Sequence, residues 1–176
     1  MSAGAVIAIS QPCPAWADAL PAVEAICHRA AELALSLAEE AIGLPPSRLE
    51  VSLALSDDAE VRSLNARFRG QDTPTNVLSF AALEDDGAPL IETERVLLGD
   101  VALAFETTAA EAAAQGLTLA EHLSHLVIHG VLHLLGYDHQ DDDEAEEMEG
   151  AERELLAHLG ISDPYDADED MDERTP

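Results

Sequence analysis

Hydrophobic and polar positions follow two different periods along the chain. A period of two, typical of strands, is clearest between Leu49 and Leu55, where every second residue is apolar and Glu50 and Ser52 fall on the other face. Shorter runs rich in Val, Leu, Ile and Phe predict further strands. The predicted strands are residues 6–9, as a candidate edge strand, 49–55, 75–82 and 96–105.

A helical period of 3.6 residues occupies much of the remaining chain. Capping-box patterns, Asp57 with Glu60 and Thr118 with Glu121, mark two helix starts. The predicted helices are residues 21–42, 57–68, 106–115, 118–135 and 141–159, and residues 84–87 read as a turn or loop. The order of elements predicts an α+β fold, a single domain over residues 1–160 in which a small mixed sheet of about four strands packs with helices.

Composition and charge narrow the class of protein. The 176 residues are 47% hydrophobic, enough for a core, which excludes disorder throughout the chain. There are 36 acidic residues against 8 basic ones, all arginines, for a net charge of −28. Such a surface repels polyanions at long range, so a protein that coats nucleic acid is excluded, whereas local action on nucleic acid is not. The acidic residues 161–176 are expected to form a flexible tail.

The sequence also predicts a cytoplasmic protein with no membrane partner. Cys13 and Cys27 are too few for a disulfide framework and favour a reducing compartment. The start of the chain has no basic region and only a short apolar run, unlike an export signal. No stretch of about 20 residues lacks charge, so no transmembrane helix is expected.

The segment from His129 to His139 contains the strongest candidate for chemistry. His129 and His133 are four residues apart in a predicted helix, so both imidazoles project from one face. Gly136 can end that helix and let His139 turn back toward the same point. Three imidazoles without a fourth protein ligand predict a catalytic metal site at the C-terminal end of a helix. His122 and His125, earlier in the helix, are interpreted as packing or supporting residues.

Three rival functions share parts of this pattern. Zinc peptidases of the metzincin type have the same histidine spacing but need a glutamate after the first histidine, where this chain has Gly130. A hydrolase of another substrate remains open on spacing alone. A noncatalytic ribosome-assembly factor with a structural zinc would need a fourth protein ligand, which the motif lacks.

Two further segments point to a family. Residues 64–80, Gly99-Asp100-Val101 and the complete HGVLHLLGYDH run resemble the YbeY family of bacterial metal-dependent endoribonucleases, over roughly residues 49–139. The chain departs from that family at Ala81, where a proline is usual. The resemblance implies a zinc-dependent endoribonuclease, specific for single-stranded RNA, that acts in 16S ribosomal RNA 3′ end maturation and ribosome quality control. Implied partners are the rRNA precursor and the small ribosomal subunit with its proteins, but not DNA.

The resemblance also implies residue roles. One Zn²⁺ per chain is bound by His129, His133 and His139, although nickel, cobalt and copper also accept imidazoles. Arg69 is the functional arginine, which we expect to bind a phosphate and neutralise its negative charge while the metal activates water. The nucleophile, metal hydroxide or ribose 2′-hydroxyl, stays open. Asp138 is either a supporting residue or proton acceptor, or a turn-forming one.

Substrate binding presents a physical difficulty. Arg62 and Arg67 are weak candidates for substrate contacts and form, with Arg69 and Arg95, the one plausible local basic cluster. Neither half of the chain is basic overall. We therefore expect weak binding to bare RNA, with the ribosome or a protein partner supplying much of the targeting.

Overall fold

The computed structural model describes residues 4–82 and 95–165. The chain divides into two compact units, one up to Gly136 and one from Tyr137 onward. The predicted turn at residues 84–87 and most of the predicted tail lie outside the described residues. The predicted boundary at residue 160 stays a prediction.

The first unit contains the sheet and most of the helices. Its elements are β1 (Val6–Ser10), α1 (Ala15–Ala19), α2 (Val23–Leu35), α3 (Ala38–Ile42), a 3-10 turn (Pro46–Arg48), β2 (Leu49–Ser56), α4 (Asp58–Arg69), β3 (Val77–Ala81), β4 (Val96–Ala104), α5 (Phe105–Gln115) and α6 (Leu119–Leu134). The second unit contains α7 (Asp142–His158).

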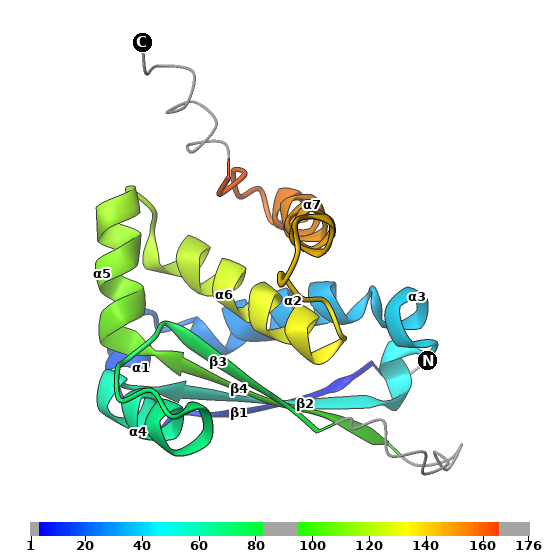
Figure 1. Cartoon of the computed structure of the whole chain (residues 1–176). Helices are drawn as coiled ribbons and strands as arrows, with labels where there is room; N and C mark the ends of the chain where they lie inside the picture. The colour runs from blue at the N-terminus through cyan, green and yellow to red at the C-terminus, as the bar shows by residue number, and fades with distance from the viewer. Residues whose placement is uncertain (1–3, 83–94, 166–176) are drawn as a thin grey trace. The chain divides into compact units, whose positions relative to one another are not determined.

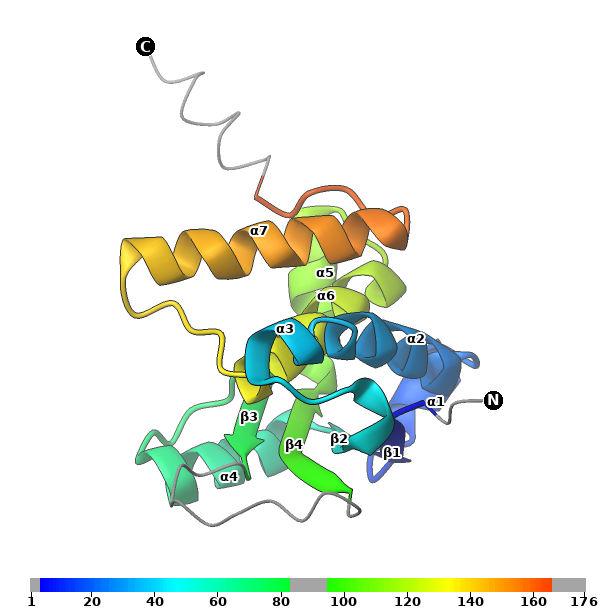
Figure 2. The same cartoon turned by 90° about the vertical axis from the view of Figure 1, so that its right-hand side faces the viewer.

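Within the described ranges, the sheet has four strands in the order β1-β2-β4-β3. The pairs β1–β2 and β2–β4 are parallel, whereas β3 runs antiparallel to β4. Helices α2 and α6 cover one face of the sheet, and α4 lies against the other (Figures 1 and 2). The predicted α+β fold with a small mixed sheet is confirmed, and β1 is an edge strand as expected.

The alternation along β2 explains which side the core occupies. Leu49, Val51, Leu53 and Leu55 are all buried, and the residues between them line the opposite face. The buried side chains face α2 and α6, where Leu123, Ile128 and Leu132 are also fully buried. The inward and outward assignments made from the sequence are therefore correct.

Two helix predictions need correction. The predicted helix 21–42 is two helices, α2 and α3, separated by a turn at Ser36 and Leu37; the Ser36 hydroxyl donates to the Leu33 carbonyl within this turn. The sequence analysis missed α1, since Pro12 and Pro14 suggested only a break. Pro14 instead precedes the first turn, where a missing N–H costs nothing, and Trp16 anchors the helix by donating from Nε1 to the Ser56 carbonyl at 2.8 Å.

Both cysteines are buried and form no disulfide. Burial raises the pKa of the Cys27 thiol to about 12, so this thiol stays protonated and unreactive near neutral pH. Among the described helices, none has both the length and the apolar character needed to cross a bilayer.

Candidate metal centre and its surroundings

Helix α6 positions the first two predicted ligands. Thr118 and Glu121 form the predicted capping box, which fixes where the helix starts. One turn apart, His129 and His133 are half-buried, and their Nε2 atoms are 3.1 Å apart. Two ligands of a tetrahedral zinc ion with bonds of 2.0–2.1 Å would have nitrogens about 3.3 Å apart. The spacing of this pair therefore fits a shared metal ion.

The predicted glycine stop is present at the end of α6. Gly136 has a φ of +100°, a conformation that favours glycine and ends the helix. His139 lies in the second unit and is exposed. The Asp138 carboxylate accepts the His139 backbone N–H at 2.8 Å.

Gly130 lets α6 approach the sheet closely. A Cβ at this position would lie 2.7 Å from Val101 Cγ1 and 3.2 Å from Ser79 Oγ. The Ser79 hydroxyl donates to the Gly130 carbonyl at 3.1 Å. This contact ties β3 to the helix turn that carries His129. Ser79 and Val101 lie in the family motifs, but their contact with Gly130 was not predicted, although a glycine inside an apolar helix is itself a signal of close backbone packing.

Arg69 is the last residue of α4 and contacts the backbone of β3. The backbone groups of Asn76 and Ala82 pair with β4, so the Ser79 carbonyl between them points to the free edge of the sheet. Arg69 Nη2 donates to that carbonyl at 2.8 Å, and its guanidinium lies 5.8 Å from the Phe80 ring centroid. Ser79 thus contacts the predicted functional arginine with its backbone and the ligand-bearing helix with its side chain.

The weaker arginine candidates differ in their surroundings. Arg62 donates to both carboxylate oxygens of Asp72, at 2.8 and 3.2 Å, and that hydrogen bonding raises the pKa of Arg62 while lowering the pKa of Asp72. Arg67 is exposed, and its guanidinium lies 5.9 Å from the Phe68 ring centroid. The structure therefore groups Arg67 with Arg69 around two phenylalanines, whereas Arg62 is already paired.

The remaining histidines of α6, His122 and His125, lie on earlier turns of the helix. His122 is buried, and its Nε2 lies 3.0 Å from Glu111 Oε1, which also accepts from Asn76 at 3.0 Å. The His125 ring centroid is 6.3 Å from those of both His122 and His129. These contacts join α5, α6 and the start of β3.

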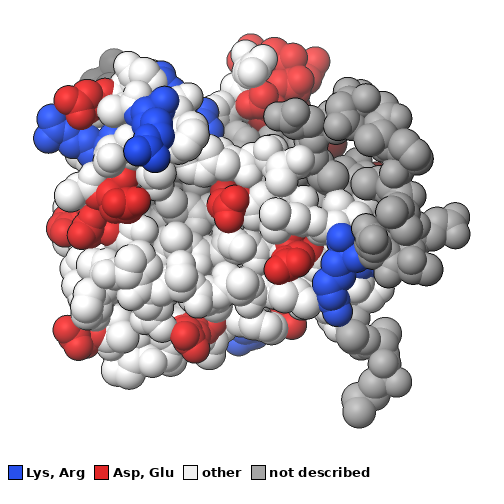
Figure 3. Space-filling view, turned by 90° about the horizontal axis from the view of Figure 1, so that it is seen from below, with Lys and Arg blue, Asp and Glu red and all other residues white. Residues whose placement is uncertain are grey.

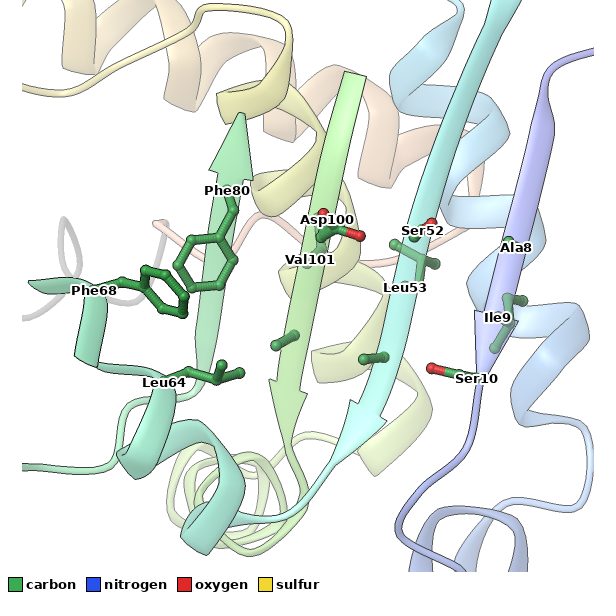
Figure 4. A pocket seen from close by; sticks show the side chains of 12 residues that line it. Ala8, Ile9, Ser10, Ser52, Leu53, Leu64, Phe68, Phe80, Asp100 and Val101 are labelled. Carbon is green, nitrogen blue, oxygen red and sulfur yellow. The ribbon is translucent and has the colours of Figure 1, made fainter. Parts of the chain in front are cut away.

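A groove of about 490 Å³ lies on the sheet face away from α2 and α6. Phe68 and Phe80 stand together at one side of it, and Asp100 and Ser52 project from the central strands (Figure 4). Arginine side chains gather at the corner of this face over α4, and much of the adjoining surface is uncharged (Figure 3). The groove is lined by Ala8, Ile9, Ser10, Ser52, Leu53, Ala54, Leu64, Phe68, Phe80, Asp100, Val101 and Ala102.

An α+β fold with a histidine group on a buried helix and an arginine bound to the adjacent strand defines a candidate metal-dependent hydrolase. The sequence profile of the family described as endoribonuclease YbeY matches residues 20–160. The chain belongs to the endoribonuclease YbeY family. Membership supports an endoribonuclease activity and hence an RNA substrate.

Individual relatives agree with the family profile. The chain is 60% identical to the endoribonuclease YbeY of Paramagnetospirillum magneticum, over 90% of this chain and 94% of that protein. It is 51% identical to that of Rhodospirillum rubrum, over 85% and 76% of the two chains. The solution structure of TM1509 from Thermotoga maritima superposes with a TM-score of 0.52 at 25% identity, covering 90% of this chain and 98% of that one.

Proposed function

We propose that this protein is a zinc-dependent endoribonuclease that cleaves single-stranded RNA, with His129, His133 and His139 as the metal ligands and Arg69 as the catalytic arginine. The observation that carries the proposal is the facing pair of histidine Nε2 atoms, 3.1 Å apart, on a helix whose packing partner Ser79 also holds Arg69. Chain connectivity supports His139, because it follows His133 by only six residues and a helix-ending glycine.

The role of Arg69 follows from the donors it retains. A guanidinium carries five N–H donors, and the Ser79 carbonyl takes one at 2.8 Å. The others can bind two oxygens of a scissile phosphate and stabilise the negative charge that develops on them. A metal ion bound by the histidines would supply Lewis-acid activation at the same phosphate. The Asp138 carboxylate accepts the His139 backbone N–H, and we assign it a supporting role for that backbone.

Gly130 argues against a peptidase. A zinc peptidase with this histidine spacing needs a glutamate there as general base. Even a Cβ at Gly130 would lie 2.7 Å from Val101 Cγ1, so the packing of α6 on the sheet leaves no space for a longer side chain. This close packing therefore counts against a peptidase mechanism.

We further propose a cytoplasmic role in ribosomal RNA processing, at the 3′ end of 16S rRNA, and in ribosome quality control, with the small ribosomal subunit as partner. The family resemblance supports this role. The net charge of −28 supports a targeting partner, since long-range repulsion weakens binding to bare RNA. Arg67 and Arg69 would supply local phosphate contacts, while Arg62 contributes less because Asp72 already pairs with it.

The test is cleavage of a labelled single-stranded RNA by the wild type, His133→Ala, Arg69→Ala and Arg29→Ala, with zinc content measured by mass spectrometry. Arg29 is an exposed arginine on α2 and controls for lost charge. We expect cleavage by the wild type and Arg29→Ala and a loss of at least about a hundredfold in the other two. Equal cleavage by all four would indicate a contaminating nuclease. Zinc-loaded protein inactive on RNA and on small-subunit precursors would favour the assembly-factor alternative.

A further inference from the structure

Phe68 is a large apolar side chain that is mostly exposed to solvent. It occupies the second-last position of α4, and 60% of its surface is accessible to solvent. Among the described residues, only Val6 and Leu97 are other large hydrophobic side chains with comparable exposure, at 36% and 43%. Isolated exposed apolar residues need no explanation, so the surroundings of Phe68 decide whether it has a role.

Those surroundings combine aromatic rings with arginines. The Phe68 and Phe80 ring centroids are 5.4 Å apart at an interplanar angle of 64°, so Phe80 packs edge-to-face against one side of the exposed ring. The Arg67 guanidinium lies 5.9 Å from the Phe68 centroid, and that of Arg69 lies 5.8 Å from the Phe80 centroid. A chain with only eight basic residues thus places two of them at this aromatic pair.

The groove beside Phe68 has the charge pattern of a base site rather than a phosphate site. Most of the side chains that line it are apolar or small, and the charged one is Asp100 (Figure 4). A phosphate would be repelled by the Asp100 carboxylate and attracted to Arg67 and Arg69 at the edge. An uncharged nucleobase suits the apolar interior, so the two parts of a nucleotide have separate, complementary surfaces here.

We propose that Phe68 is a base-stacking residue: an unpaired base of the RNA substrate stacks on its ring at the mouth of the groove while the adjoining phosphates contact Arg67 and Arg69. This inference rests on the proposed function and deepens it. Aromatic and arginine planes commonly bind unstacked bases, and stacking tolerates any base because each has a π-face. Paired bases in a duplex cannot offer that face, so this site would favour single-stranded RNA.

The test compares KM and kcat for a single-stranded oligoribonucleotide among Phe68→Ala, Phe68→Leu and Phe68→Tyr. Leu97→Ala is the matched control, because Leu97, on β4, is also an exposed apolar residue. We expect Phe68→Ala to raise KM about tenfold to a hundredfold with kcat within about twofold. Phe68→Leu should behave like Phe68→Ala because it keeps the apolar surface without the π-face. Phe68→Tyr should restore KM, and Leu97→Ala should not change it.

Several results would overturn the inference while leaving the nuclease intact. An unchanged KM in Phe68→Ala, or a normal KM in Phe68→Leu, would show that no base stacks on the ring. An unchanged KM together with weaker binding of Phe68→Ala to purified small ribosomal subunits would assign the exposed ring to that particle instead. If the wild type cleaves nothing, the nuclease proposal fails, and the dissociation constants of the same variants for the oligoribonucleotide decide the stacking separately.

Discussion

Gly130 shows how a single position can serve both packing and specificity. Its missing side chain lets α6 approach Val101 and Ser79, and His129 lies on the same turn of this helix. The sequence analysis used Gly130 only as the absence of a glutamate. The steric reason for the glycine depends on β3 and β4, whose residues are about 30 to 50 positions away in the chain.

We predict that Gly130→Ala destabilises the protein by about 1–3 kcal/mol, because the new Cβ overlaps Val101 Cγ1 at 2.7 Å. The measurement is urea unfolding at neutral pH, with zinc affinity determined alongside. Val101→Ala in the same chain removes the clashing methyl groups and should recover part of the loss. Additive losses in the double variant would contradict the steric explanation.

Helix α6 is the element on which the candidate site depends most. Its capping box pairs Thr118 with the Glu121 backbone N–H at 3.1 Å and Glu121 with the Thr118 backbone N–H at 2.9 Å. The Glu121 carboxylate is stabilised first by the Thr118 backbone N–H and then by the Thr118 side chain, and this hydrogen bonding lowers the pKa of Glu121. Because the histidines project from later turns of the same helix, its start sets their register.

We predict that Thr118→Ala lowers the free energy of unfolding by about 1 kcal/mol in urea unfolding, whereas Thr118→Ser lowers it little, since serine keeps the accepting hydroxyl.

A lowered pKa in the folded state means that the contribution of Glu121 to stability is present at neutral pH and disappears as the pH falls through the acidic range. Glu121→Gln should therefore show a smaller loss of stability on acidification than the wild type, measured by urea unfolding between about pH 7 and pH 3. Parallel pH curves would argue against the capping role of the carboxylate.

Charge dominates at the scale of the whole molecule. Thirty-six acidic residues against eight arginines create self-repulsion in the folded state and repel RNA. The basic side chains near the site, Arg67 and Arg69, act only at short range. Salt screens the self-repulsion and should therefore raise protein stability. Salt also weakens the phosphate contacts of Arg67 and Arg69, because less is gained from counterion release, so RNA affinity should fall.

We predict that raising NaCl from about 50 to about 500 mM increases the melting temperature while weakening binding of single-stranded RNA. Two phosphate contacts correspond to a log–log slope of about −1.4 for the binding constant. Arg67→Ala should reduce that slope by about half, whereas Arg29→Ala should leave it unchanged. Tight RNA binding that does not depend on salt would contradict the local-contact account.

The sequence by itself determined the features that rest on local periodicity. The alternation of β2, the helix that carries His129 and His133, its capping box and its glycine stop all follow from spacing between near neighbours in the chain. The family motifs, likewise local, were confirmed by the family profile. Local rules did not locate the turn at Ser36 and Leu37 or the short helix α1 that follows Pro14.

Only the tertiary structure decided how distant segments share one site. The contacts of Ser79 with Arg69 and Gly130 depend on the position of β3 beside β4 in the described sheet. The hydrophobic pattern around Ser79 does not predict these contacts. The pairing of Phe68 with Phe80 and the groove beside them likewise depend on α4 packing across the strands. Such contacts join residues far apart in sequence through strand order and helix packing, which periodicity alone does not encode.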